Sequence, residues 1–239
     1  MGARTPVSSG NGPNAFMQCK MFFCFQGNNH IEKRKELTCE EIFKVLATLK
    51  QMGCYHIGFS GGEPFFRKDF LGILAEAKRL GFVVTFVSNM QLPSDSQIDL
   101  LADIGVDLIT VSFHSIEPTK YAKIFGVSTD LYHRALRNIR HLIAESCHVG
   151  VVATISTENY SEMPEYIEFF RAEGIKSERI NFNLLIQGEN PISGFRMSEE
   201  LLNILQSNPD IAARMIKKRR HHICAVLHAF LVPLLRMEM

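Results

Sequence analysis

Apolar and polar residues follow a repeated unit along most of this 239-residue chain. In each unit an amphipathic stretch of helical period leads to a glycine, and a short run rich in Val, Ile and Phe follows. The segments KVLATLKQMG before CYHIGFS and LAEAKRLG before FVVTFVS show the unit most clearly. Because helices alternating with nearly continuous apolar strands are typical of parallel sheets, the pattern predicts an α/β fold.

The repeat predicts six strands, and a glycine often separates a helix from the strand after it. Such glycines suit helices that end in a left-handed residue, and they stand at Gly53, Gly81, Gly105 and Gly174. The strands are expected near residues 16–20, 55–59, 83–87, 107–111, 149–155 and 180–185. Six such units fit a closed or partial barrel and also a doubly wound open sheet, and the repeat alone leaves both open.

Four of the apolar runs end in serine, at Ser60, Ser88, Ser112 and Ser156. In parallel α/β folds, ligands bind at the carboxyl ends of the strands, where small hydroxyl residues can approach them closely. Serine is also common wherever strands meet loops, so one such residue carries little weight. Four together favour a binding site at this edge of the sheet.

The composition indicates one large globular domain with a full core, because 46% of the residues are hydrophobic. The net charge is only +1, so we expect neither a nucleic-acid nor a membrane partner. Residues 1–15 are rich in Gly, Ser, Pro and Asn and are expected to be a disordered lead-in. They lack the apolar core of a secretory signal, which predicts a cytoplasmic location.

Six cysteines are ambiguous, because a cytoplasmic chain uses them as metal ligands or as packing residues and seldom as disulfides. Three of them, Cys39, Cys54 and Cys147, stand at the starts of predicted elements and are interpreted as packing residues. The other three, Cys19, Cys24 and Cys224, remain candidates for other roles.

The strongest local motif is Gly61-Gly62-Glu63-Pro64, which directly follows the predicted strand YHIGFS. Two adjacent glycines allow a sharp turn that exposes backbone groups to a ligand, and Glu63 adds a negative charge. The loop therefore suits a ligand with an ammonium group. It lacks the spacing of a phosphate-binding loop, and a Gly-Gly pair alone is more often a plain tight turn.

From Cys24 to about Leu185 the chain resembles the radical S-adenosylmethionine (SAM) superfamily. The resemblance rests on CFQ near the start, on GGEP after its strand, and on FVVTFVSN. The stretch VSFHSIEPTKYAKIFGVSTDLYHRALRNIRHL is similar to members that modify ribosomally made peptides. The resemblance implies a partial (β/α)6 TIM-like barrel over residues 16–205 that binds SAM and a [4Fe–4S] cluster. Such an enzyme cleaves SAM reductively to a 5′-deoxyadenosyl radical.

The resemblance also assigns roles to residues by position. Gly61, Gly62 and Glu63 would hold the amino group of SAM, and Ser88 and Asn89 would lie near its ribose. Ser112 would lie near the ribose or the methionyl carboxylate. The resemblance assigns no catalytic side chain.

The metal ligands depart from the family pattern, which is three cysteines spaced CxxxCxxC. Cys24 matches the last of them, but Met17 and Met21 stand where the other two are expected, and Cys19 is a doubtful substitute. A thioether is a poor replacement for a thiolate on iron, so we expect weak cluster binding or none. A one-base shift of reading frame turns the codons of Met17-Gln18 and Met21-Phe22 into cysteine codons. Residues up to about 21 are therefore hypothesised to be out of frame.

The end of the chain shows a similar departure. Residues 206–239 are interpreted as a truncated extension of the auxiliary-cluster (SPASM-like) type, possibly out of frame, with Cys224 as a remnant. The apolar run 225–235 is too short to span a membrane and is interpreted as a tail. The basic run 217–222 is interpreted as a solvated helix end.

Three functions stay open on this evidence. The first is a radical SAM enzyme acting on a precursor peptide, with flavodoxin or ferredoxin as reductant. The second is a SAM-binding or peptide-binding barrel without a competent cluster. The third is a small-molecule radical SAM enzyme of cofactor biosynthesis. His114, just past Ser112, fits a ligand contact and a structural role equally well, and Asp69 is interpreted as a helix cap.

Overall fold

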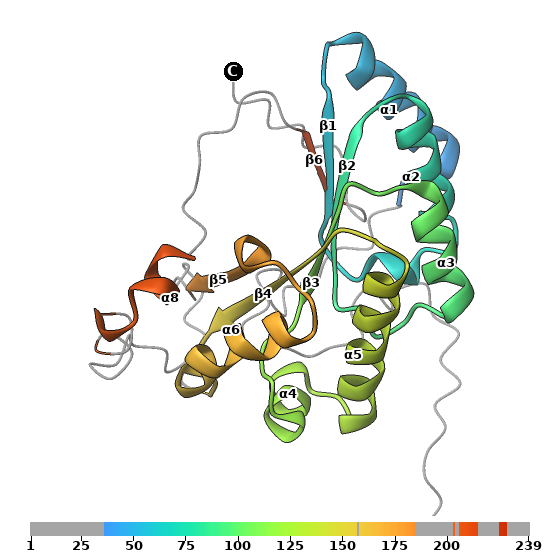
Figure 1. The fold of residues 1–239 in the computed structure, drawn as a ribbon. Helices are drawn as coiled ribbons and strands as arrows, with labels where there is room; N and C mark the ends of the chain where they lie inside the picture. The colour runs from blue at the N-terminus through green and yellow to red at the C-terminus, as the bar shows by residue number, and fades with distance from the viewer. Residues whose placement is uncertain (1–35, 157, 185–202, 204–205, 215–224, 229–239) are drawn as a thin grey trace, which may run out of the picture.

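The fold is built on one sheet of six parallel strands in the order β5-β4-β3-β2-β1-β6 (Figure 1). The computed structural model describes residues 36–156, 158–184, 203, 206–214 and 225–228. The strands are β1 (His56–Ser60), β2 (Val83–Ser88), β3 (Leu108–Ser112), β4 (Val149–Ile155), β5 (Ile180–Leu184) and β6 (Ala225–His228). The five strands predicted between residues 55 and 185 are confirmed within one residue at their starts, whereas the predicted strand 16–20 lies outside the described residues.

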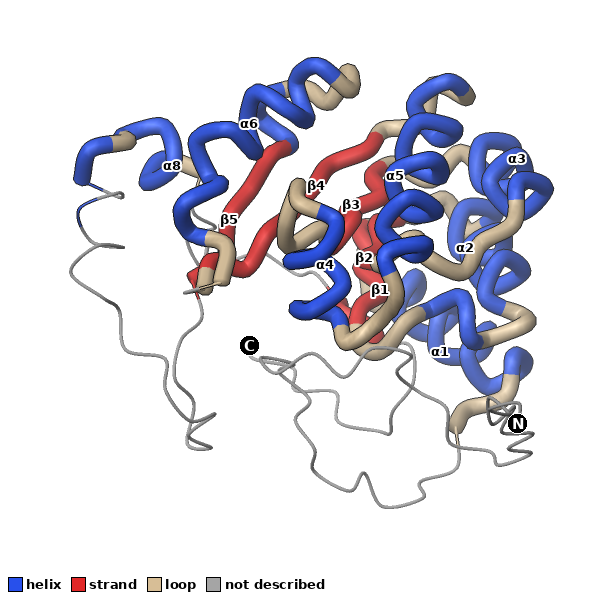
Figure 2. Tube along the Cα trace, turned by 90° about the horizontal axis from the view of Figure 1, so that it is seen from below, coloured by secondary structure: helices blue, strands red, loops and turns tan. Residues whose placement is uncertain are grey.

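Helices connect the strands and cover one face of the sheet, as Figures 1 and 2 show. They are α1 (Cys39–Gln51), α2 (Phe70–Arg79), α3 (Asp95–Ile104), α4 (Pro118–Phe125), α5 (Thr129–Ala144), α6 (Met163–Ala172) and α8 (Pro209–Ala213). Short 3-10 turns add η1 (Pro64–Phe66), η2 (Tyr160–Glu162) and η3 (Ser177–Arg179). This arrangement confirms an α/β fold of the partial TIM-like barrel type.

Burial alternates along the first three strands and distinguishes their two faces. Ile57 and Phe59 of β1 are buried, and Phe59 packs edge-on against Phe70 of α2 at 5.9 Å between ring centroids. His56, Gly58 and Ser60 alternate with them and are half-buried. Successive strand residues point to opposite faces, so one face packs on helices and the other is the less covered inner face of the barrel.

Helix ends agree with the glycine prediction. Gly53, Gly81, Gly105 and Gly174 all have positive φ, between 70° and 93°. Capping boxes begin α1 at Thr38 and α3 at Ser94. In each, the cap side chain accepts a backbone N–H three residues later, and the side chain of that later residue accepts the backbone N–H of the cap. Both ends of these helices are therefore specified locally, which orients the loops at the carboxyl edge of the sheet.

Two predictions about single segments need correction. Asp69 makes no capping bond to α2, because both its carboxylate oxygens accept hydrogen bonds from Arg67, at 2.8 and 2.6 Å. The hydrogen bonds from Arg67 lower the pKa of Asp69. Residues 225–228 are not a tail, because they form β6 and pair in parallel with β1, with Gly58 beside Val226. The edge of β1 offers unpaired backbone N–H and C=O groups, and pairing with them makes these four residues a strand.

The predicted division into residues 1–15, 16–205 and 206–239 stays a prediction, since much of the first and last ranges lies outside the described residues. The run 217–222 lies outside them as well. None of the described helices has the length and apolar composition needed to cross a membrane.

Candidate functional site

The Gly61–Pro64 loop leaves β1 at the carboxyl edge of the sheet. Gly61 has φ of 135°, a conformation that residues with a side chain rarely adopt, so glycine is required here. Pro64 then begins η1, with Glu63 as its N-cap residue. Gly61 is exposed and Gly62 half-buried, which leaves the backbone of the turn accessible next to a buried carboxylate.

Glu63 joins this loop to the end of the neighbouring strand β2. Its Oε1 accepts hydrogen bonds from the Ser88 hydroxyl at 2.8 Å and from the Phe65 amide at 3.3 Å. Its Oε2 accepts one from the Asn89 amide at 2.8 Å. Three of the residues assigned by the resemblance, Glu63, Ser88 and Asn89, therefore form one hydrogen-bonded group.

The charge of Glu63 has no cationic partner among the described residues. Its side chain is almost entirely buried, and burial raises its pKa from 4.5 to about 7, against the lowering effect of its hydrogen bonds. A carboxylate accepts about four hydrogen bonds, and three are made here. The site thus combines a buried negative charge, a spare acceptor position and an accessible glycine turn.

The other strand-end serines divide into two kinds. Ser112 ends β3 beside Val152 of β4, and like Ser60 it is half-buried on the inner face of the sheet. Ser156 is fully buried, and both its amide and its hydroxyl donate to Asn159 Oδ1, at 2.7 and 3.2 Å. Ser156 therefore closes a turn, whereas Ser60 and Ser112 lie where a ligand on the inner face would meet them.

A second buried carboxylate, Glu162 of η2, was missed from the sequence. Its Oε2 accepts hydrogen bonds from the Ser115 hydroxyl at 2.7 Å and from the Ile116 amide at 3.0 Å. Lys120 Nζ lies 2.8 Å from its other oxygen, and the hydrogen bond to Glu162 raises the pKa of Lys120. This group ties the loop after β4 to the loop after β3.

His114 has a structural role. It is buried, its ring stacks on Phe125 at 4.9 Å between centroids, and its Nδ1 accepts the Thr154 amide at 3.1 Å. Burial lowers its pKa to about 3, so the ring is neutral near pH 7. A neutral, enclosed imidazole of this kind holds the loop after β3 and does not carry charge to a ligand.

Sequence candidates for cluster ligands lie outside the described residues, namely Cys19, Cys24 and Cys224. Cys39, Cys54 and Cys147 are free thiols that are half-buried or buried, as predicted for packing residues. Another group of ligand-type side chains, Asp99, His141 and Glu145, lies on the outer layer formed by α3 and α5. In this group His141 Nε2 lies 2.8 Å from Asp99 Oδ1. None of the three residues belongs to the GGEP loop.

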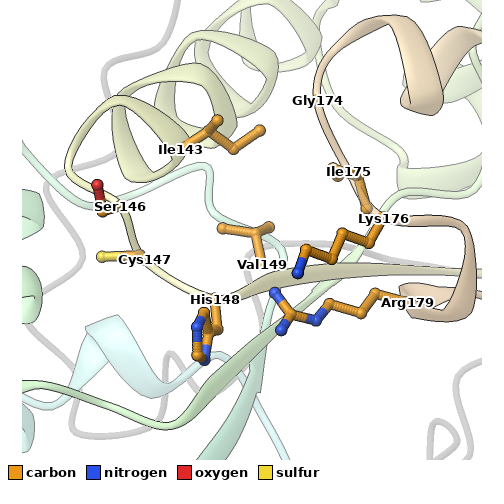
Figure 3. Close-up of a pocket in the computed structure, with 9 residues that line it drawn as sticks. All are labelled: Ile143, Ser146, Cys147, His148, Val149, Gly174, Ile175, Lys176 and Arg179. Carbon is orange, nitrogen blue, oxygen red and sulfur yellow. The ribbon is translucent and has the colours of Figure 1, made fainter.

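A shallow pocket lies at the opposite end of the strands, where β4 and β5 begin (Figure 3). Its lining includes His148, Lys176 and Arg179 around the first residue of β4, Val149. It belongs to the amino ends of the strands, whereas Glu63, Ser88 and Ser112 lie at their carboxyl ends. It is therefore separate from the candidate site.

The family comparison decides the identity of the chain. The model of the family described as "Radical SAM superfamily" matches residues 22–170, more than half of the sequence. The chain belongs to the radical SAM superfamily. The matched range contains the GGEP loop, Ser88, Asn89 and Ser112.

Solved radical SAM structures share this fold. Streptococcus suis SuiB bound to S-adenosylmethionine matches with a TM-score of 0.69 and 18% identity, over 89% of this chain and 48% of that chain. The same protein bound to its precursor peptide SuiA matches with a TM-score of 0.69 and 19% identity, over 90% of this chain and 47% of SuiB. TYW1 with a lysine-pyruvate adduct matches with a TM-score of 0.58 and 16% identity, over 82% of this chain and 70% of TYW1. At these identities the likeness establishes the fold, and the chain spans about half the length of SuiB.

The residues at the carboxyl edge fit SAM. Its methionyl ammonium would match the buried carboxylate of Glu63, which none of the described cations pairs with, beside the exposed Gly61 turn. Its hydroxyl and carboxylate groups match the half-buried Ser112 on the inner face. The fit of a [4Fe–4S] cluster depends on residues 17–24, which lie outside the described residues.

Proposed function

We propose that this chain is the SAM-binding core of a radical SAM enzyme that modifies a peptide substrate. Family membership supports the chemistry, and the likeness to SuiB, solved with SAM and with its precursor peptide SuiA, supports the substrate class. With SAM and a reduced [4Fe–4S] cluster bound, the cofactors supply a 5′-deoxyadenosyl radical for hydrogen abstraction.

The observation that carries the proposal is the buried carboxylate of Glu63, which has no cation beside it in the described part of the chain. Burying an unpaired charge is costly, and an ammonium group of a ligand offsets that cost. Gly61 and Gly62 contribute backbone acceptors, and the Asn89 and Ser88 donors keep the carboxylate aimed at the turn. Ser112 on the next strand along contributes a hydroxyl to the ribose or carboxylate of SAM.

A second candidate is a SAM-binding or peptide-binding barrel without redox chemistry. The observation that favours it is the presence of Met17 and Met21 where the family loop has cysteines. Two thiolates are then missing from a site that needs three, while the Glu63 group is intact.

Anaerobic cluster reconstitution of the full chain, with SAM titrated by calorimetry, separates the two candidates. If the chain is a radical SAM enzyme, we expect [4Fe–4S] absorbance. We also expect release of 5′-deoxyadenosine when dithionite, or reduced flavodoxin or ferredoxin, is added. SAM binding without cluster absorbance supports the second candidate and contradicts the first. Absence of SAM binding contradicts the first candidate and the SAM-binding form of the second.

A gain-of-function pair makes the test sharper. The double variant Met17→Cys, Met21→Cys restores the CxxxCxxC spacing with Cys24 and is expected to assemble the cluster. The matched control, Met52→Cys, adds an exposed cysteine outside that loop and is expected to add no cluster absorbance. If the control gains as much iron as the double variant, iron binding is unspecific.

A further inference from the structure

The loop from Asn89 to Pro93, which follows β2, has a strained backbone. Met90 has φ of 54° although it is not glycine, and its side chain is completely buried. A left-handed conformation is unfavourable for such a residue and persists where the surrounding structure imposes it. Contacts from neighbouring elements must therefore hold this loop in place.

Two side chains of α5 hold this loop by its carbonyl oxygens. Asn138 Nδ2 donates to the carbonyl of Met90 at 3.0 Å and to that of Pro93 at 3.1 Å. Arg134, one helical turn earlier on the same face, donates to the carbonyl of Leu92 at 2.9 Å. Three carbonyls of the loop are thus bound from one helix face.

The bound loop is continuous with the donors that contact Glu63. The Met90 amide donates to the Ser88 hydroxyl at 2.9 Å, and that hydroxyl donates to Glu63. The amide of Asn89, the residue just before Met90, donates to the other oxygen of Glu63. A displacement of Met90 therefore moves both donors away from the carboxylate.

Asn138 is an exceptional residue for its position on α5. The other buried residues of this helix are Tyr132, Ala135, Leu136, Ile139 and Leu142, and an amide buried among them is costly unless it is hydrogen-bonded. Both hydrogens of its amide nitrogen are used on the loop carbonyls. The amide nitrogen of this polar side chain is thus used wholly on the loop, while its Oδ1 accepts a hydrogen bond from Arg137 at 3.3 Å.

We infer that Asn138 is a positioning residue of the SAM site, which fixes the Asn89–Pro93 loop from α5 so that Ser88 and Asn89 hold Glu63 in place. The inference rests on the proposed function as far as SAM is concerned. The hold on Glu63 is a property of the unliganded protein and is measured without SAM.

The test uses Asn138→Leu in the full chain, because leucine fills a similar volume and removes the two donors. The first readout is the pKa of the Glu63 carboxyl, followed by NMR without SAM. It is expected to rise above its wild-type value as the Asn89 amide leaves the carboxylate. The second readout is the dissociation constant of SAM, expected to rise about tenfold, the scale on which lost supporting contacts weaken a site.

Two controls separate positioning from stability. Leu142→Ala removes a buried side chain from the same helix farther from the loop and lowers stability, but it is expected to leave both readouts unchanged. Arg140→Gln alters the exposed face of α5 at its ion pair with Glu173 and is expected to change neither readout. If Asn138→Leu fails to fold, Arg134→Gln, which loses only the bond to Leu92, replaces it with smaller shifts in the same directions.

The inference is overturned if Asn138→Leu leaves the pKa of Glu63 and the SAM dissociation constant at the values of Leu142→Ala. A wild-type protein that binds no SAM contradicts the proposed function. In that case the Glu63 titration still decides whether Asn138 positions the carboxylate, so the two failures are distinguishable.

Discussion

Two buried carboxylates at the carboxyl edge of the sheet, Glu63 and Glu162, share two kinds of hydrogen-bond donor and differ in their third partner, which is the Phe65 amide for Glu63 and Lys120 for Glu162. Each accepts hydrogen bonds from a serine hydroxyl and a backbone amide, which are Ser88 and Asn89 at the end of β2 in one case and Ser115 and Ile116 in the loop after β3 in the other. Glu162 also has Lys120 Nζ at 2.8 Å, whereas no cation among the described residues pairs with Glu63.

The difference indicates which carboxylate is structural and which is available to a ligand. At Glu162 the protein itself supplies the positive charge, so the group closes two loops together. At Glu63 the same loop-closing bonds are present, but the charge is balanced only when the group is protonated or when a cation binds.

Removing Glu162 is expected to cause the largest loss of stability. Glu162→Leu leaves the Ile116 amide and Lys120 without their acceptor and the buried Ser115 hydroxyl with only the Glu117 carbonyl at 3.2 Å, which should cost about 4 kcal/mol of unfolding free energy. Urea denaturation measures it. A loss below about 1 kcal/mol would show that this group does not hold the two loops.

The pH dependence of stability should report Glu63. Its pKa in the folded protein is about 7 against the ordinary 4.5, so the folded state holds the proton more tightly than the unfolded state. Stability contributed by this group is therefore greatest below pH 4.5 and falls as the pH rises to about 7, by about 3 kcal/mol in total.

Glu63→Gln removes that titration, so the difference in unfolding free energy between variant and wild type should move in favour of the variant between pH 4.5 and 8. Chemical denaturation at several pH values measures this difference. A difference that is independent of pH would mean that folding leaves the pKa of Glu63 unchanged.

SAM affinity should depend on Glu63 and not on Lys120. Glu63→Gln keeps the shape of the side chain but loses its charge. The free energy of SAM binding should become less favourable by about 2 kcal/mol, which raises the dissociation constant roughly thirtyfold. In the wild type, affinity should increase as the pH rises through 7, because the ionised carboxylate binds the ammonium group. Calorimetric titration measures both effects, and equal losses in Lys120→Gln would contradict the contrast.

Removing the cation alone should have the smallest effect. The side chain of Lys120 is 38% exposed, so water can partly solvate Glu162 after Lys120→Met, and the expected loss is about 1 kcal/mol. Thermal or urea unfolding measures it. A loss as large as that of Glu162→Leu would show that the ion pair, and not the hydrogen bonds to the loop after β3, holds this region.

The amino-acid sequence alone determined the layers of the fold and the place of the site. Strand and helix positions followed from apolar periodicity, and the glycines that end the helices followed from backbone sterics. Both effects act over a few residues. The GGEP motif and the family resemblance also indicated Glu63, Ser88 and Asn89 as neighbours in function. The strand formed by residues 225–228 was missed, because pairing with β1 joins positions about 170 residues apart.

Only the tertiary structure decided how the site is held. Asn138 and Arg134 are an unremarkable pair in the sequence of α5, although an asparagine on its apolar face was a signal that could have been followed. That they bind the carbonyls of Met90, Leu92 and Pro93 depends on how α5 packs against a loop more than 40 residues away. Likewise, a glutamate is charged or neutral near pH 7 according to its burial and its partners, and these exist only once the chain has folded.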